Sequence, residues 1–525
     1  MLQIPLSMQV IAAITPISIF IITHILLNWK AGKSASLSFM IAAILYLVVF
    51  GGNFNLLGIS IGKGLAITSF VTLLVFGASF FQNFMDISGN LKIISGKIVQ
   101  VTGDREMGIL LIGWAFSGLI QGIAGMGVPV VIVAPLLILF KLTPLRAVCL
   151  ALIGHSWAVT WGSLGASFYT IQLVTDVNPD QLKLVLAPLG ILPIFLTGIG
   201  CLLILGGYKT ILKKLHLIII MGIPMSCFHY FSIIFGFEPI ASLSAGLAGC
   251  IAGWIFVQVS KKFTNNATNQ IQNEFSNKNS ITLKDHKSTQ MAFLPYYVLF
   301  SIIMLSQIPI IKTFCKKLVF GFNFLGGETN LGHIIQAEEN FASISIIHPG
   351  LLIITSVFIS LLFYRIKSAD DLPNIKKLIN QSFSELITPL ITLSFLLTLS
   401  MILRDSGALN IITLQIAPLT GPLFPIVSPF IGMLGVFITG SNQSSNILFG
   451  DLQSQIASHL GINNILIIAL HSLSSGLNSA VAPAKIILGT AALKISGTET
   501  QILKKTLPFC IIMTLLLGII GYILK

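Results

Sequence analysis

Apolar segments of about 20 residues recur along this chain from residue 8 to the C-terminus. A helix of that length crosses the hydrocarbon core of a bilayer, and runs such as residues 217–237 lack the alternation that indicates a membrane β-barrel. Charged residues make up only 9% of the 525 residues, too few for the surface of a soluble globule. The sequence therefore predicts an all-α polytopic membrane protein with about 12 to 14 spans or half-spans.

The net charge of +13 comes from basic residues that gather in short loops between the apolar segments. In a soluble protein such a charge suggests nucleic-acid binding, but in a membrane protein Lys and Arg mark the cytoplasmic loops. We therefore expect a protein embedded in the lipid bilayer, with no nucleic-acid partner; the resemblance described below implies the bacterial inner membrane. The basic loops fall on one side of the membrane when the spans between them are counted in pairs: 30–33, 209–214, 261–287 and 365–377. Residues 8–27 are expected to be a retained first span with the N-terminus outside, because no Lys or Arg precedes them.

One long polar stretch, residues 261–290, divides the chain. It is rich in Asn, Lys, Gln, Ser and Thr, a composition typical of a disordered linker. We expect an N-terminal membrane half at 1–260, a cytoplasmic linker at 261–290 and a C-terminal membrane half at 291–525. A second polar stretch, about residues 312–345, is expected outside the membrane on the opposite side.

Each half contains a small or polar interruption, at residues 117–129 and 435–450, followed by a His-Ser pair. The pairs are His155-Ser156 and His471-Ser472. Irregular backbone survives within hydrocarbon only where protein or a water-filled cavity surrounds it. The pattern predicts a repeated architecture whose broken or re-entrant helices meet at a substrate site near the membrane midplane.

The second interruption is the more polar of the two. From Thr439 to Asn446 every residue except Gly440 has a hydrogen-bonding side chain. A helix that begins near Ser444 would offer free N–H groups to an anion, worth about 0.3 to 2 kcal/mol. We therefore expect a small organic anion as substrate. The candidate substrate-binding residues are Gln121, Gly122, Gly125, Gly127, His155, Ser156, Ser441, Asn442, Ser444, Ser445, Asn446, His471 and Ser472.

Several segments resemble the L-lactate permease family. GSNQSSNILFGDLQ, preceded by SPFIGMLGVFITG, resembles the family's most characteristic segment, Gly-Ser-Asp-x-Ser-Ser-Asn, an apolar pair and Leu-Gln. SGLIQGIAGMGVP resembles the family's Glu-Gly-x-Ala-Gly-Phe-Gly-x-Pro, and FSELITPL, DSGAL and the block from His471 to Glu499 follow in the family's order. The resemblance covers most of the chain and implies a proton-coupled importer of lactate, glycolate or a related 2-hydroxy acid, built from two inverted repeats. It implies no cofactor and no enzymatic activity.

The chain departs from the family pattern at positions that bear on coupling. Gln121 and Asn442 stand where the family has acidic residues, and Ser479 stands where it has a Lys. Both family Asn-Thr pairs have become His-Ser pairs, led by His155 and His471. An imidazole, with a reference pKa near 6.5, can carry a proton at physiological pH. Either the two histidines have taken over proton coupling, or each is neutral and hydrogen-bonded in a packed interior.

The coupling candidates are His155, His471, Glu385 and Lys485. Glu385 matches an acidic family position, where it would cap a helix or join the proton path. Lys485 lies within an apolar segment and is expected to face the cavity, paired with a carboxylate, or to extend to the end of its span. Arg404 and Asp405 are expected to anchor a span at the interface, with contact between Arg404 and an anionic substrate as the alternative.

Two other functions stay open from the sequence. Sodium could replace protons, because Asn442, Ser444 and Ser445 supply neutral oxygen ligands. A membrane-embedded hydrolase could use Ser156 and His155, but no orienting carboxylate and no GxSxG elbow accompanies them. The sequence offers no HExxH and no paired Cys/His spacing, so we expect no metal site, and the six cysteines are expected to pack in the core. Oligomeric state is not predicted.

Overall fold

The computed structural model describes residues 5–27, 29–91, 93–94, 105–125, 127–263, 289–306, 308–315, 318–367 and 374–525. Residues 264–288, most of the predicted linker, lie outside this described part. Within it, twelve helices are long and apolar enough to cross a membrane, or fourteen if each of two bent helix pairs counts as one span. The predicted all-α polytopic membrane protein is confirmed.

Helices make up most of the described residues in both halves. The N-terminal half contains α1 (Leu6–Ile21), α2 (Ala31–Val48), α3 (Phe54–Ile87), α5 (Arg105–Leu110), α6 (Ser117–Ile123), α7 (Val128–Ile138), α8 (Pro144–Ser156), α9 (Gly162–Thr175), α10 (Pro179–Leu189), α11 (Ile191–Gly206), α12 (Tyr208–Ile234) and α13 (Ala241–Phe263). The C-terminal half contains α15 (Thr289–Ser306), α16 (Pro309–Cys315), α17 (Pro349–Lys367), α18 (Ile375–Asp405), α19 (Ala408–Thr420), α20 (Phe424–Thr439), α21 (Asn442–His459), α22 (Asn464–Leu477), α23 (Pro483–Ala492) and α24 (Glu499–Leu524). Two short 3₁₀ segments matter for the site, η3 (Val159–Trp161) and η6 (Asn478–Val481).

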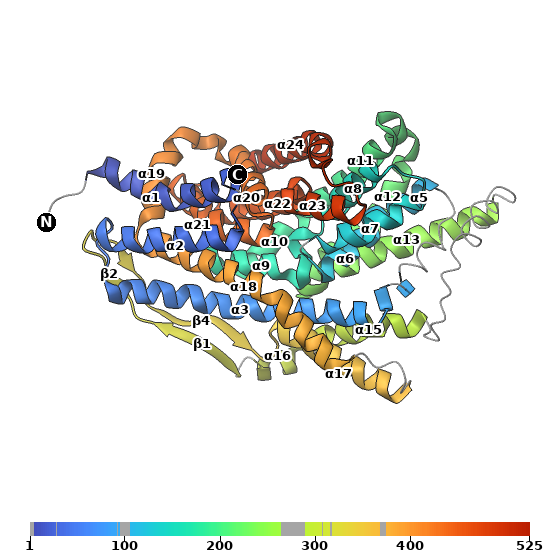
Figure 1. The fold of residues 1–525 in the computed structure, drawn as a ribbon, viewed down its shortest axis with the longest axis horizontal. Helices are drawn as coiled ribbons and strands as arrows, with labels where there is room; N and C mark the ends of the chain where they lie inside the picture. The colour runs from blue at the N-terminus through green and yellow to red at the C-terminus, as the bar shows by residue number, and fades with distance from the viewer. Residues whose placement is uncertain are drawn as a thin grey trace.

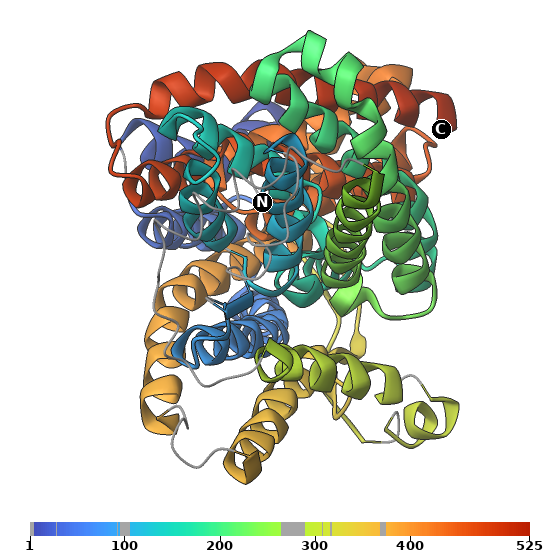
Figure 2. The same ribbon diagram turned by 90° about the vertical axis from the view of Figure 1, so that its right-hand side faces the viewer.

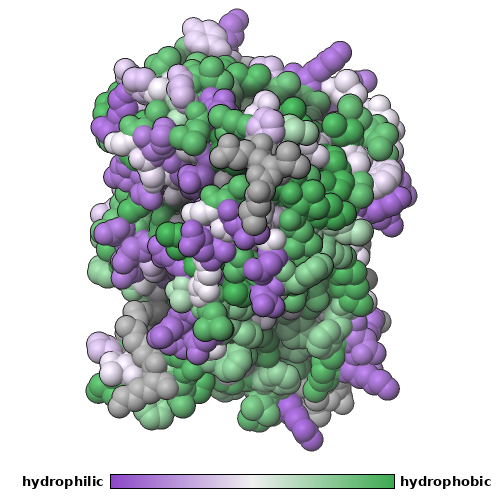
Figure 3. Space-filling view, turned by 90° about the vertical axis from the view of Figure 1, so that its left-hand side faces the viewer, coloured by the Kyte–Doolittle hydropathy of each residue, from purple (hydrophilic) through white to green (hydrophobic). Residues whose placement is uncertain are grey.

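The second polar stretch, about residues 312–345, contains two antiparallel β-ribbons that the sequence did not predict. Strand β1 (Val319–Phe324) pairs with β4 (Glu338–Ser345), and β2 (Gly327–Glu328) pairs with β3 (Ile334–Ile335). The ribbons lie at the same end of the molecule as the N-terminus (Figure 1). Seen from that end, hydrophilic side chains gather over part of the surface and hydrophobic side chains cover much of the rest (Figure 3). We call this the ribbon end.

The same order of elements occurs once in each half. In the first half α6, an interruption and α7 are followed by α8, η3 and α9; in the second, α20, an interruption and α21 are followed by α22, η6 and α23. The two series pair crosswise, because α9 packs on α21, α7 packs on α23, and η3 packs on α22. The helices of each series are therefore covered in part by helices of the other series.

The interruptions have local causes in the sequence. Gly440 ends α20 in a left-handed conformation, φ +73°, that is unstrained without a Cβ, and Gly127 begins α7 in the same way at φ +88°. The first turn of α9 is less favourable, since Ser163 and Leu164 have φ of 48° and 57°. Left-handed backbone costs a residue with a side chain about 1 to 2 kcal/mol. The packing around Ser163 and Leu164 must offset this free-energy cost. The same packing therefore holds the backbone in its left-handed conformation at the break.

Two long helices without such breaks cover the repeats on one side. The helices α3 and α18 pack along each other, and their backbones approach closely where a Cβ at Gly64 would lie 2.5 Å from Cα of Thr398. Viewed from the end opposite the ribbons, α3, α15 and α17 group on one side of the molecule and most of the remaining helices lie on the other (Figure 2). The interrupted helices thus face a continuous helical wall.

Candidate functional site

A cavity of about 680 Å³ lies where the interruptions face α3 and α18. Its wall takes residues from the breaks after α6 and α20, from the first turns of α9 and α23, and from the middle of α3 and α18. The predicted substrate-binding residues that line it are Gln121, Gly125, Ser441, Asn442 and Ser444. Two predicted coupling residues, Glu385 and Lys485, also line it. Sequence positions more than 300 residues apart therefore share one cavity.

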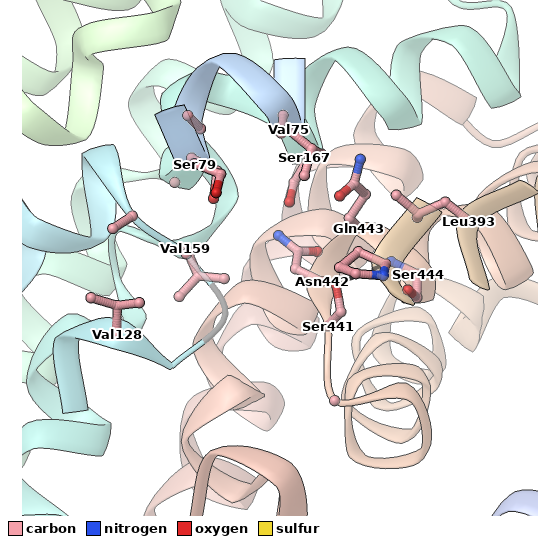
Figure 4. A pocket seen from close by; sticks show the side chains of 18 of the residues that line it. Val75, Ser79, Val128, Val159, Ser167, Leu393, Ser441, Asn442, Gln443 and Ser444 are labelled. Carbon is pink, nitrogen blue, oxygen red and sulfur yellow. Dashed lines mark hydrogen bonds between the residues drawn. The ribbon is translucent and has the colours of Figure 1, made fainter. Parts of the chain in front are cut away.

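The N-terminus of α21 points polar groups into this cavity (Figure 4). Ser441 caps the helix, and its Oγ accepts a hydrogen bond from the backbone N–H of Ser444 at 3.5 Å. Asn442 is 2% exposed, and neither its side-chain nitrogen nor its side-chain oxygen has a hydrogen-bond partner in the described residues. A buried amide without partners costs about 1 to 3 kcal/mol. A ligand that supplied those partners would recover part of that cost.

Gln121 brings a second unpartnered group from the other repeat. Its side chain is buried, lines the cavity, and leaves Oε1 without a hydrogen-bond partner among the described residues. Glycines make room for it, because a Cβ at Gly162 would lie 2.4 Å from Nε2 of Gln121. A Cβ at Gly125 would lie 2.2 Å from Oγ of Ser163. These close approaches explain why small residues crowd the first interruption.

Lys485 is the buried cation of the site. It is 4% exposed, lies in the first turn of α23, and has no carboxylate within 4 Å of Nζ among the described residues. The predictions of carboxylate pairing and of extension to a span end are both wrong. Lys485 faces the cavity because the two breaks enclose it: a Cβ at Gly127 would lie 3.8 Å from its Cγ, and a Cβ at Gly440 would lie 3.2 Å from Cβ of Ala484.

His155 lies behind Lys485, outside the cavity wall. Its Nε2 is 3.5 Å from Nζ of Lys485, and its Nδ1 is 2.7 Å from the carbonyl oxygen of Ala151. The carbonyl can only accept, so Nδ1 carries the hydrogen and Nε2 turns its lone pair toward the ammonium group. In this tautomer the imidazole is the hydrogen-bond acceptor of Lys485.

His471 has a different neighbourhood from His155. Its Nδ1 contacts Nε2 of Gln453 on α21, while its Nε2 is buried without a partner in the described residues. It does not line the cavity, although it is fully buried beside the wall. The two histidines match in sequence order, but only His155 contacts a charged group.

The remaining predicted residues hold the breaks in place. Asn446 donates from Nδ2 to the carbonyl of Ser167, at 3.1 Å, and to Oγ of Ser472, at 3.3 Å, and so ties α9 to α22. Ser445 donates to a backbone carbonyl, and Gly122 and Gly127 permit close contacts with neighbouring helices. Ser156 donates to the carbonyl of Ile153 at 2.8 Å, not to His155, so the pair lacks the contact of a Ser-His nucleophile.

Glu385 sits at the exposed mouth of the cavity. It accepts hydrogen bonds from Asn83 at 2.7 Å, from Ser79 at 3.1 Å and from Gln381 at 3.1 Å, all neutral donors. The prediction that it caps a helix is wrong, because α18 begins ten residues earlier and Asn374 caps it. Sequence reasoning placed the start of this span too late because the first turns of α18 are polar.

A charge cluster at the ribbon end was not predicted. Lys63 on α3 is buried, 2.9 Å from Glu338 on β4 and 3.9 Å from Asp405 at the end of α18. Arg404 lies 3.8 Å from Asp176, which follows α9. Arg404 and Asp405 are therefore parts of an ion-pair network, and Arg404 does not line the cavity. The isolated Lys63 within the apolar run GISIGKGLAITS was the available sequence signal.

Comparison with known proteins identifies the family. The sequence profile of L-lactate permease matches residues 9–525. The chain belongs to the L-lactate permease family. Glycolate permease GlcA of Escherichia coli K12 is 23% identical over 98% of this chain and 95% of its own length. The L-lactate permease of Bacillus subtilis 168 is 26% identical, covering 83% of this chain and 81% of that protein, and the L-lactate permease of Streptococcus iniae is 25% identical, covering 87% and 92%.

Membership in the L-lactate permease family places both interruptions within the shared architecture, since the match spans them. The three relatives are named permeases, and none is named a hydrolase. Together with the missing Ser156–His155 contact, this favours carriage of a ligand over chemistry on it. Lys485 and the unpartnered amides of Asn442 and Gln121 then indicate the charge and the hydrogen-bonding groups that such a ligand needs.

Proposed function

We propose that this member of the L-lactate permease family carries a small monocarboxylate, such as lactate, glycolate or a related 2-hydroxy acid, across the bacterial inner membrane together with protons. The observation that carries the proposal is Lys485, a buried ammonium group that lines the cavity and has no carboxylate partner in the described residues. A buried charge without a counter-ion is costly, so the site favours an anion.

The cavity offers complementary groups for each part of such a substrate. Lys485 provides the ion pair for the carboxylate, and the N-terminus of α21 with the Asn442 amide provides further donors. The Oε1 atom of Gln121 is free to accept a hydrogen bond from a 2-hydroxyl group. Val75 and Val128 supply apolar wall for the short carbon chain. Charge-assisted hydrogen bonds of this kind contribute about 1.5 to 3 kcal/mol each.

Proton coupling is supported by the chemistry of the groups at the cavity. Gln121 and Asn442 are amides that cannot titrate, so the proton needs another carrier. His155 shares its lone pair with Lys485, and the carboxylate of Glu385 is held only by neutral donors at the mouth. An incoming anion beside Lys485 would offset the positive charge next to His155, so that the site can take up a proton with the substrate. Substrate and proton would then bind together.

The orientation follows from charge. The helix α18 begins with lysines on the side of the cavity mouth and ends at the ribbon end. Because Lys and Arg mark cytoplasmic loops, we propose that the mouth faces the cytoplasm and the ribbons and N-terminus face outside.

The test uses the purified protein in liposomes. We expect counterflow of labelled L-lactate or glycolate, and accumulation driven by an inward proton gradient, both unchanged when sodium is removed at constant pH. Loss of uptake without sodium would replace protons by sodium as coupling ion, and absence of counterflow with every short carboxylate would reject the proposed substrate class.

Two variants distinguish the contributions of His155 and His471 to proton coupling. His155→Asn is expected to weaken proton-driven accumulation, because it removes the acceptor of Lys485, whereas His471→Asn has no charged neighbour to disturb. Proton-coupled uptake that stays undiminished in both variants would end the idea of a histidine relay.

A further inference from the structure

Asp451 is a buried carboxylate on α21 that the site described above does not use. It is 7% exposed, and among the described residues its carboxylate has no ion-pair partner within 4 Å. Its recorded hydrogen bond comes from Nε2 of Gln455, one turn along the same helix, at 3.3 Å. A buried carboxylate held by one neutral donor is costly when ionised and is a natural proton acceptor.

The nearest charges come from the ends of two other helices. Arg404 and Asp405 at the end of α18, and Asp176 after α9, act electrostatically on Asp451. Arg404 directs Nη2 toward Asp176, at 3.8 Å, while its Nη1 is buried without a hydrogen-bond partner in the described residues. Asp405 is already engaged by the Oγ of Ser60, at 2.9 Å. Among the described residues, Arg404 is therefore a cation that acts on both Asp176 and Asp451.

The other helices packed on α21 add no charge near this carboxylate. The helices α19 and α20 contain no charged residue. The helix α22 contributes His471, which contacts Gln453, and α9 contributes Tyr169. The protonation of Asp451 thus depends first on its burial, then on Arg404 and the hydrogen bond from Gln455, and last on Asp405 and Asp176.

Asp451 lies further along α21 than the residues that line the cavity. It follows Asn442 by nine residues, about 13 Å along α21, and Arg404 follows Glu385 by nineteen residues, about 28 Å along α18. The α18 end also contacts the ribbons through Asp405, Lys63 and Glu338. One helix, α21, therefore carries polar groups that line the cavity at its first residues and a buried carboxylate further along, near the end of α18.

We propose that Asp451 is the proton-binding residue loaded from the ribbon side, and that Arg404 exchanges between Asp176 and Asp451 as Asp451 gains or loses its proton. This inference rests on the proposed proton-coupled transport. A hydronium ion at the ribbon side gives its proton to a carboxylate oxygen of Asp451 and leaves water; on release, water on the other side takes the proton back. Protonated Asp451 leaves Arg404 to Asp176, the pairing present in this structure. Ionised Asp451 draws Arg404 to itself and shifts the end of α21 relative to α18.

The test compares exchange with net accumulation in proteoliposomes. Exchange of labelled for unlabelled L-lactate needs no net proton movement, whereas accumulation does. A gradient of one pH unit gives at most about tenfold accumulation for a carrier that moves one proton with each anion. We expect Asp451→Asn to keep exchange within about threefold of the unmodified protein while its accumulation ratio falls to about one.

The matched control is Asp180→Asn. It likewise replaces a carboxylate by an amide, but the Asp180 side chain is 76% exposed and lies outside the group of Asp451, Arg404 and Asp176, so this variant is expected to keep proton-driven accumulation. Asp451→Glu restores a carboxylate and is expected to regain accumulation with a displaced pH dependence, which a purely structural role of Asp451 would not produce.

The possible outcomes distinguish a failure of the Asp451 inference from a failure of the proposed transport function. Accumulation by Asp451→Asn equal to that of the unmodified protein would overturn the inference, as would loss of exchange and accumulation together in both Asp451→Asn and Asp451→Glu. Absence of exchange in the unmodified protein would overturn the proposed function itself, and the role of Asp451 with it.

Discussion

The ammonium nitrogen of Lys485 lies 3.5 Å from Nε2 of His155, and this neutral imidazole is its recorded hydrogen-bond partner. The two residues come from different halves of the chain, α23 and α8. A buried ammonium group satisfied only by a neutral acceptor keeps most of its positive field, and that field points at the cavity that Lys485 lines. The pair therefore holds a positive charge where a bound anion would lie.

Lys485→Met should weaken carboxylate binding while leaving the fold intact, because methionine fills similar volume without the charge. Loss of one charge-assisted hydrogen bond of about 1.5 to 3 kcal/mol corresponds to a drop in affinity of about 10- to 150-fold. Titration calorimetry with L-lactate on the detergent-solubilised protein measures it. Lys376→Met, at the exposed start of α18, is the control and should bind normally. Equal affinity in both variants would contradict the role of Lys485.

Asn442→Asp should turn the unpartnered amide into a competing anion. At neutral pH an ionised Asp would occupy the field of Lys485 and the α21 N-terminus, weakening substrate binding by about tenfold or more. Acidification protonates the new carboxylate, so affinity should recover as the pH falls.

The control for that change is Asn442→Ala, which is neutral at every pH. Its loss of affinity should be independent of pH between 5 and 8, apart from the dependence of the unmodified protein. A pH dependence that is the same in Asn442→Asp and Asn442→Ala would show that position 442 does not face the substrate.

Ser441→Ala removes a helix cap at the site, and Asn463→Ala removes one away from it. Ser441 caps α21 and lines the cavity, whereas Asn463 caps the exposed start of α22 through N–H groups at 3.0 and 3.3 Å. Each should lower stability by about 0.5 to 2 kcal/mol. Only Ser441→Ala should also slow counterflow of L-lactate; equal transport in the two variants would leave Ser441 a purely structural role.

Gly122→Ala should destabilise the first repeat. Its Cβ would lie 2.7 Å from the backbone nitrogen of Leu243 on α13, and overpacking of this kind costs about 1 to 3 kcal/mol. Gly58→Ala on α3 meets nothing within 4 Å and should be neutral or slightly stabilising. Thermal unfolding in detergent compares the two; a similar Tm for both would contradict the close contact between α6 and α13.

Local signals predicted the spans and the interruptions. The apolar lengths and the left-handed glycines Gly127 and Gly440 act within a few residues of themselves, so a single sequence reveals them. Neighbours across the fold are different. His155 and His471 look equivalent in the chain, yet the first meets Lys485 from the other half and the second meets Gln453 from its own half.

At the ribbon end, too, the contacts between distant residues could not be predicted from the sequence. Strands β1 and β4 pair across an intervening ribbon, and their short alternating runs lie within a stretch whose polarity indicates a loop. The contact between Ser60 and Asp405 joins residues 345 positions apart. The residues around Ser60 and around Asp405 in the sequence do not predict this contact. The charge cluster and the burial of Asp451 are therefore seen only in the folded structure.

The crosswise pairing of the two repeats has a consequence for how the protein is made. The break at α9 is completed by α21, whose first residue follows Gly162 by 280 positions. A ribosome adding about 5 to 20 residues per second needs roughly 15 to 60 seconds to cover that distance. During this interval the nascent first half sits in the bilayer with strained backbone and no partner to shelter it, which makes the wait for α21 the vulnerable moment of its biogenesis.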